Sequence, residues 1–242
     1  MRTQNNGSAM GIAYAAYYGK QYIKAFDDKI DDSKLPPCLK KILNDLKKVG
    51  TSPGNMIAKF TGDPWSANYN WTMEQGKTSP DVPAHTLANS YNANTGIKTV
   101  FDVVSYTNAT ELSWAKTILH ESIHSYLTTY YIRNQKDMAA TYPQMLEEWG
   151  KSTFNKAQHE EIARTLINSI SVALENYGID KGYKLDRQFY QDMALGGLEE
   201  TDVFKALPEA QRKRISDTVN IELHGKDMEG KSKPQKSKKA GC

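Results

Sequence analysis

The sequence is poor in cysteine, with only Cys38 and Cys242 among 242 residues. Cys38 follows two prolines at a helix entry, and Cys242 ends a lysine-rich tail, so we expect no structural disulfide between them. Two cysteines also exclude a small extracellular scaffold held together by several disulfides, although they do not exclude secretion.

Long hydrophobic runs are also lacking, and none approaches the ~18 residues that span a membrane. No secretory leader pattern begins the chain, because the apolar stretch 11–18 is short and follows polar rather than basic residues. We therefore expect either a cytoplasmic location or export by a specialised secretion system. Segment 1–34 is interpreted as a junction to a larger protein.

An excess of charge is missing as well, since the net charge is only +3. Much of this positive charge lies between Lys226 and Lys239, a segment that contains six lysines and two acidic residues. The remainder is close to neutral and offers no face for nucleic acid. We expect residues 226–242 to form a disordered, solvated tail, and residues 35–225 to form one domain.

Five histidines are present, and two of them stand in a His-Glu-x-x-His motif made of His120, Glu121 and His124. The surrounding residues predict a helix, in which positions four apart share a face. His120 and His124 can then bind one zinc ion, with Glu121 acting as general base towards a water molecule. The alternative is an amphipathic helix whose two histidines have no metal.

A catalytic zinc ion needs a third protein ligand from another element. His159 lies in the first turn of the next strong helical segment and is the favoured candidate, because imidazole is the commonest zinc ligand. Glu160 and Glu161 are rival ligands, and His159 could instead be a solvated residue. His85 lies in a stretch that reads as a loop, and His224 lies near the end of a C-terminal helix.

The other elements are predicted from periodicity and from Pro and Gly positions. Helices are expected over 35–49, where Leu39, Ile42, Leu43 and Leu46 form an apolar stripe, and over 55–60. Strands and loops are expected over 61–94, with burial of Trp65, Tyr69 and Trp71. Residues 96–106 form the clearest strand, either an edge strand that lines the active-site cleft or an ordinary core strand.

After the motif helix, residues 139–153 read as a connection interrupted by Pro and Gly. Helical patches follow over 157–177, 186–195 and 208–223, the first stopped by Gly178. Mixed elements before the motif helix and helices after it predict an α+β fold with a small mixed sheet.

Four sequence blocks, at 35–43, 115–127, 159–163 and 193–198, resemble a group of zincin-like metallopeptidases of Bacteroidetes, similar to SprT-like and other His-Glu-x-x-His families. Only the second block is specific by itself. The resemblance implies a zincin-like domain with His159 as the third zinc ligand. Such domains often form the C-terminal cargo of large secreted or polymorphic-toxin proteins, which implies an immunity or carrier protein as partner.

The leading hypothesis is therefore a zinc metallopeptidase that acts on a peptide or protein substrate. Tyr183 and Tyr190 are candidate donors to the oxyanion, although packing is the alternative role for both. Two other functions remain open: an effector that carries the same peptidase, and a non-catalytic zinc-binding or interaction domain. The presence of Glu121, which only chemistry requires, argues against the non-catalytic domain.

Overall fold

The computed structural model of the chain describes residues 9–62, 69–78, 82–133 and 154–242, and its helices and strands form an α+β fold, as expected. The elements are α1 (Ala9–Lys29), β1 (Ile30–Lys34), α2 (Pro37–Lys48), α3 (Pro53–Thr61), β2 (Trp71–Gln75), β3 (Ala84–Asn92), β4 (Gly96–Phe101), α4 (Glu111–Arg133), α7 (Phe154–Thr165), α8 (Ile167–Asp180), α9 (Arg187–Ala194), α10 (Asp202–Lys205) and α11 (Glu209–His224). The connection expected over 139–153 lies outside the described residues.

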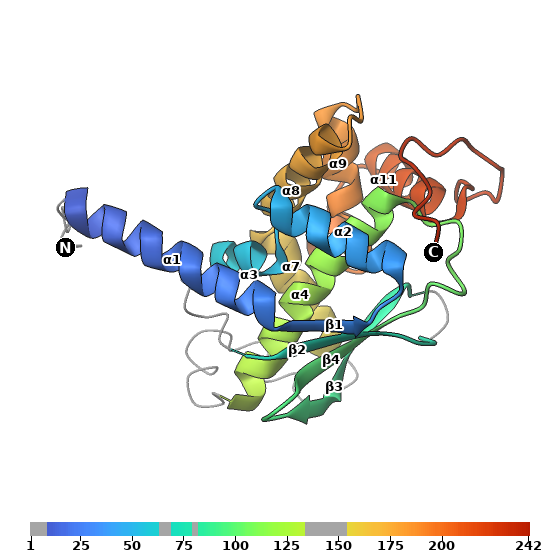
Figure 1. Ribbon diagram of the computed structural model, residues 1–242. Helices are drawn as coiled ribbons and strands as arrows, with labels where there is room; N and C mark the ends of the chain where they lie inside the picture. The colour runs from blue at the N-terminus through green and yellow to red at the C-terminus, as the bar shows by residue number, and fades with distance from the viewer. Residues whose placement is uncertain (1–8, 63–68, 79–81, 134–153) are drawn as a thin grey trace.

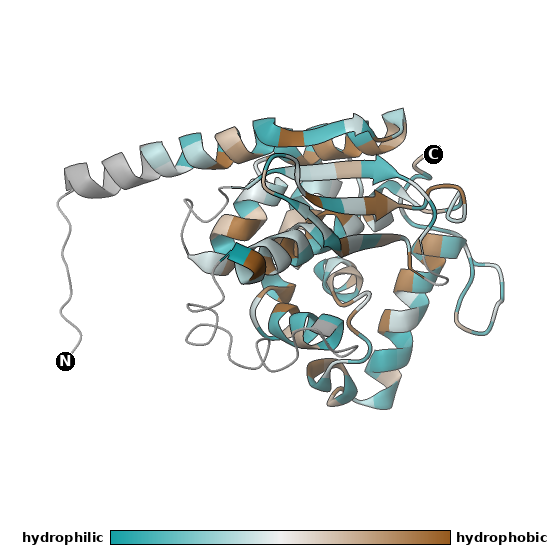
Figure 2. Cartoon of the chain, turned by 90° about the horizontal axis from the view of Figure 1, so that it is seen from below, coloured by the Kyte–Doolittle hydropathy of each residue, from teal (hydrophilic) through white to brown (hydrophobic). Residues whose placement is uncertain are grey.

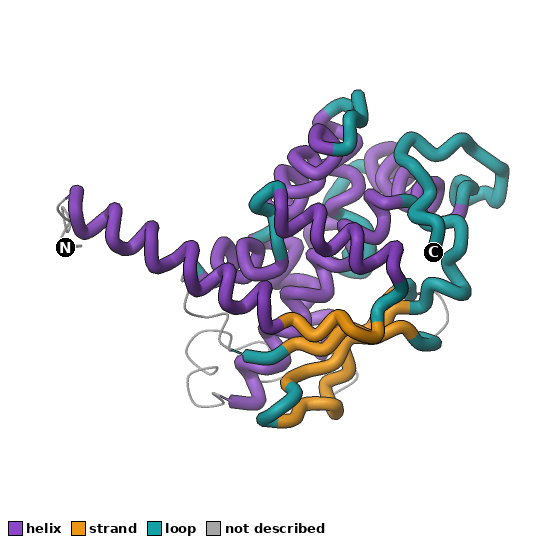
Figure 3. Tube along the Cα trace, in the orientation of Figure 1, coloured by secondary structure: helices purple, strands orange, loops and turns teal. Residues whose placement is uncertain are grey.

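The four described strands form one mixed sheet in the order β1-β2-β4-β3 (Figures 1 and 3). The pairs β1–β2 and β2–β4 are parallel, and β3 runs antiparallel to β4. The clearest predicted strand, now β4, is therefore an interior strand and ends earlier, at Phe101. The edge strands are β1 and β3. His85 lies in β3, so the expectation of a loop there was wrong.

Helix α4 is the central element of the fold. It packs against β3 and β4 and also against the helices α2, α3, α7, α8, α9 and α11. Every side chain from Leu112 to Thr129 is buried, which is what a helix with neighbours on all sides requires. The helix around the motif is thus buried all round, and its histidines lie inside the molecule.

The first helices agree with the sequence patterns. Helix α2 buries the predicted stripe, which consists of Leu39, Ile42, Leu43 and Leu46. Helix α3 begins two residues earlier than expected, because Ser52 caps it and Pro53 suits its first turn. Tyr69 and Trp71 are buried as predicted, whereas Trp65 lies outside the described residues.

The helical patch expected over 157–177 is two helices, α7 and α8, separated at Leu166. Gly178 does not stop α8, which continues to Asp180. A Cβ at Gly178 would lie 2.1 Å from the hydroxyl oxygen of Tyr190. Glycine is required here because α9 approaches α8 closely, and this reason has no local sequence signal.

The N-terminal segment does not form a unit separate from the domain expected to begin at residue 35. Strand β1 pairs with β2 at one edge of the sheet, and Phe26 and Ile30 belong to the main hydrophobic core. The end of α1 leads directly into β1 in both Figure 1 and Figure 2. The end of α1 and all of β1 therefore belong to the folded domain.

The C-terminal strap, residues 226–242, is folded, which corrects the expectation of a disordered tail. Glu222 of α11 is fully buried and accepts hydrogen bonds from the backbone N–H of Lys236 at 2.6 Å and from the Ser237 hydroxyl at 2.5 Å. The backbone of Lys238 accepts from the N–H of Glu111 at 2.8 Å, at the start of α4. Polar contacts to α11 and to the start of α4 thus hold part of the strap in place.

A disulfide joins Cys38 to Cys242, so the expectation that these cysteines stay unpaired was wrong. The two residues are 204 positions apart in sequence, yet their Cα atoms lie 5.4 Å apart, within the usual range for disulfides. The bond ties the end of the strap to the first turn of α2. Such a long-range pairing leaves no trace in local sequence patterns.

Within the described residues, no helix is both long enough and apolar enough to cross a membrane.

Candidate metal centre

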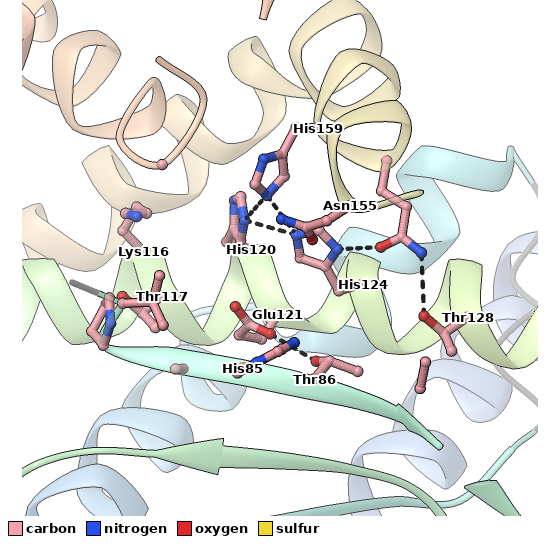
Figure 4. Close-up of a pocket in the computed structure, with 16 residues that line it drawn as sticks. His85, Thr86, Lys116, Thr117, His120, Glu121, His124, Thr128, Asn155 and His159 are labelled. Carbon is pink, nitrogen blue, oxygen red and sulfur yellow. Dashed lines mark hydrogen bonds between the residues drawn. The ribbon is translucent and has the colours of Figure 1, made fainter. Parts of the chain in front are cut away.

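Three buried histidines meet between α4 and α7. His120 and His124 lie one turn apart on α4, and His159 lies on α7. Their Nε2 atoms are 2.9 Å apart for His120–His124, 3.0 Å for His124–His159 and 3.3 Å for His120–His159. Figure 4 shows the three rings pointing towards one another. Three imidazole nitrogens at this spacing can bind one metal ion.

Two of the rings are oriented by acceptors at their other nitrogen. The Nδ1 of His159 lies 2.5 Å from a carboxylate oxygen of Glu200, and the Nδ1 of His124 contacts the amide oxygen of Gln158. An acceptor at Nδ1 keeps the proton there and leaves the Nε2 lone pair free, as in protein metal sites. The Gln158 amide is held in turn by donating to Thr128 at 3.2 Å.

Burial keeps two of the imidazoles neutral. It lowers the pKa of His159 to about 2, and it lowers the pKa of His120 well below its ordinary value. The neighbouring histidines act in the same direction, because two positive rings would repel each other. Neutral imidazole is the form that binds metal ions.

The donor set fits a zinc ion. Three nitrogens placed ~2.0–2.1 Å from a tetrahedral zinc ion are about 3.3 Å from one another. The Nε2 spacings of 2.9–3.3 Å lie close to that geometry. Without a cation, the Nε2 lone pairs of His124 and His159 would have at most one donor between them, the Nε2 of His120, and a buried acceptor without a donor costs free energy. The chemistry of this cluster therefore suits Zn²⁺.

The cluster opens into a cavity of about 290 Å³. Its wall includes His120, Glu121, His124 and His159, together with Pro83 to Thr86 from β3 and the turn before it. The Glu121 side chain points towards β3, where its Oε2 accepts a hydrogen bond of 2.7 Å from the Thr86 hydroxyl (Figure 4). The cavity thus brings a carboxylate and the three imidazoles to one space beside an edge strand.

Lys116 also lines this cavity, one turn before His120 on α4. Its Nζ donates to the backbone oxygen of Gly196 at 2.9 Å, and burial lowers its pKa. Gly197, with a φ of 83°, leaves space between this group and the cluster. A Cβ there would lie 3.6 Å from Nζ of Lys116 and 3.7 Å from Cε1 of His120.

The other candidate residues lie elsewhere. Glu160 accepts from the backbone N–H of Asp202, and Glu161 pairs with Arg164, so neither glutamate belongs to the histidine cluster. His224 ends α11 against Tyr106. His85 is exposed on β3 and lines the cavity without joining the cluster.

Neither candidate tyrosine reaches the cavity. The Tyr183 hydroxyl donates to Glu111 at 2.7 Å, and the Tyr190 hydroxyl is buried against Gly178. Both have the packing role that was the alternative. Sequence reasoning missed Lys116, Thr86, Gln158 and Glu200. Only Lys116 had a usable signal, because Lys116, His120 and His124 repeat every four residues along one helix face.

Comparison of the chain with protein-family models, with curated proteins and with solved structures finds no match.

Proposed function

We propose that the protein is a zinc-dependent peptidase, with His120, His124 and His159 as zinc ligands and Glu121 as general base. The observation that carries this proposal is the presence of three convergent Nε2 atoms and the Glu121 carboxylate in one cavity. A metal site used only for structure is closed, whereas a catalytic one has three protein ligands and an open position. This cluster opens to a cavity and so suits catalysis.

A zinc ion at this site would supply Lewis-acid chemistry, lowering the pKa of a water molecule from about 15.7 towards 7 and polarising the scissile carbonyl. Glu121 accepts the proton from the attacking water and passes it to the leaving amine nitrogen as the C–N bond breaks. Water adds its oxygen to the carbonyl carbon, so the products are a carboxylic acid and an amine.

Lys116 is the best candidate for stabilising the oxyanion that forms in this reaction. Its ammonium group has three N–H donors, and one of them is used by the oxygen of Gly196. A cationic donor held in a buried position needs little reorganisation when negative charge develops. It takes the role that the sequence suggested for Tyr183 or Tyr190.

The edge strand favours a peptide as substrate. Among the described residues β3 pairs with a strand only on its β4 side, and part of it lines the cavity. An extended peptide can add to such an edge through backbone hydrogen bonds, which would place its carbonyl groups along the cavity. This geometry favours cleavage within a chain over hydrolysis of a small amide.

The disulfide favours an exported protein over a cytoplasmic one. Disulfides persist in oxidising compartments and are rare in the reducing cytosol. The Cys38–Cys242 bond therefore supports the reading of this chain as a secreted peptidase or effector, for which an immunity or carrier protein would be the partner.

The alternative of a non-catalytic zinc domain does not account for Glu121 in the cavity.

The test is digestion of a peptide library by the zinc-loaded full-length protein and by Glu121→Gln. Glutamine keeps the shape of the side chain but cannot accept the proton, so we expect cleavage to fall ~10²–10⁴-fold. Zinc content measured in the same samples should be equal. Cleavage by the variant at the parental rate, or no cleavage by the zinc-loaded parent, would contradict the proposal.

A further inference from the structure

A chain of buried hydrogen bonds runs from the sheet to the Glu121 carboxylate. The Trp71 indole Nε1 lies 2.8 Å from the Thr99 Oγ1, which lies 2.7 Å from the Thr86 Oγ1. The Thr86 hydroxyl donates to Oε2 of Glu121 at 2.7 Å. All four side chains are at most 8% exposed, so water does not replace these bonds.

The register of the sheet places the side chains of this hydrogen-bond series next to one another. Thr86 and Thr99 are directly opposite each other on β3 and β4, and Thr99 is opposite Met73 on β2. Trp71, two positions before Met73, shares the same face of the sheet, because side chains alternate along a strand. Three neighbouring strands thus each contribute one side chain to the hydrogen-bond series that ends at α4.

The hydrogen bonds from Trp71 to Glu121 all donate in one direction. An indole N–H can only donate, so Thr99 accepts from Trp71. The Glu121 carboxylate can only accept, so Thr86 gives its one proton to Glu121 and accepts from Thr99. The acceptor at Glu121 thus fixes the direction of both hydroxyl protons, and the donor at Trp71 is compatible with that direction.

We infer that Thr86 is a positioning residue for Glu121, at the end of a one-way hydrogen-bond relay anchored by Trp71 and Thr99. This inference rests on the proposed function for its kinetic consequence but on the relay geometry for its existence. Among the described residues, Oε2 is the only Glu121 carboxylate oxygen with a hydrogen-bond partner. The relay fixes that oxygen and leaves Oε1 to accept the proton from water.

The kinetic test compares Thr86→Val with Thr86→Ser. Valine keeps the volume but removes the hydroxyl, and a catalytic group misplaced by about 1 Å can cost ~10²-fold in rate. We expect kcat of Thr86→Val to fall about 10–100-fold with KM and zinc content unchanged. Serine restores the donor and should return kcat to within about threefold of the parent.

Thr129→Val is the matched control. Thr129 is also buried, on the same helix as Glu121, but its hydroxyl has no partner among the described residues. Its kcat should equal that of the parent. The inference is overturned if Thr86→Val keeps the parental kcat, or if serine restores no more activity than valine.

A second readout does not need activity. In the metal-free protein labelled with ¹⁵N-tryptophan, the Trp71 indole resonance is assigned as the one missing in Trp71→Phe. We expect its proton to shift upfield in both Thr86→Val and Glu121→Ala, because loss of a downstream acceptor weakens the whole chain. Thr129→Val should not shift the Trp71 indole proton. If Thr86→Val does not fold, Thr86→Ala replaces it in this measurement.

This readout separates the two proposals. If the zinc-loaded parent cleaves no peptide but the indole proton shifts as expected, the peptidase assignment fails and the relay stands. If the parent cleaves peptides but the indole proton keeps its parental position in both Thr86→Val and Glu121→Ala, the relay is wrong and the peptidase assignment is unaffected.

Discussion

At the scale of single residues, Lys116 is the group that the sequence motif did not identify. It lies on the same face of α4 as His120 and His124, with its Nζ fixed by the oxygen of Gly196. The glycine at position 197 leaves open the space between this ammonium group and the cluster. The structure thus brings four side chains of the proposed site from one helix, three of which belong to the motif.

We predict that Lys116→Met lowers kcat ~10²-fold, the usual cost of losing one donor to the oxyanion. Methionine keeps a long unbranched side chain, so zinc content should not change. Lys47→Met is the control, because Lys47 also donates to a backbone oxygen, that of Asp27, but does not line the cavity. A Lys116→Met enzyme with parental kcat would rule out this role.

The sequence could predict His120, Glu121 and His124 because all three depend only on helix periodicity. His159 required the further assumption that the next helix packs beside the motif helix, and the structure brings it to the other two histidines. Thr86 and Glu200 could not be predicted, because they reach the site through strand register and through the turn after α9. Their positions depend on contacts between distant parts of the chain.

At the scale of elements, α4 and β3 determine the shape of the site. The predicted helix around the motif is present, but it is buried on all sides, so its histidines face other elements and not solvent. The edge strand beside the cavity is β3, because β4 lies between it and β2. β-branched and aromatic residues identified β4 as a strand, but strand order is a property of the whole sheet and has no local pattern.

The division between α7 and α8 also could not be predicted from local sequence patterns. The sequence from 157 to 177 has continuous helical character, yet the chain turns at Leu166. That turn lets α7 contact α4 near the cluster, while α8 packs against α4 and α9. The packing of neighbours decides the break, whereas helix propensity alone favours one longer helix.

At the scale of the whole molecule, the C-terminal strap is tied to α2 through the disulfide between Cys242 and Cys38. The expected disordered tail is instead held by Glu222, by the backbone at Thr110 and Glu111, and by Cys38. Lysine-rich composition indicated solvation, and all six of these lysines are indeed exposed. Composition could not reveal that buried Glu222 provides acceptors for backbone N–H groups of the same segment.

We predict that Cys38→Ser lowers the free energy of unfolding by about 2–5 kcal/mol, because the disulfide closes a very long loop. For a chain of this size the melting temperature should fall by about 5–20 °C. Reduction of the parent should produce the same fall, and reduction of Cys38→Ser no further fall. An unchanged melting temperature after reduction would show that the disulfide does not stabilise the fold.

The central claim is that His120, His124 and His159 together hold one zinc ion. Native mass spectrometry of the metal-depleted full chain, titrated with zinc chloride, tests it most directly. The account predicts one zinc ion per parent chain, and markedly weaker binding in His159→Ala but not in Glu160→Ala or Glu161→Ala, since loss of one of three ligands opens the site. A parent that binds no zinc, or a His159→Ala variant that binds it as tightly as the parent, would contradict the account.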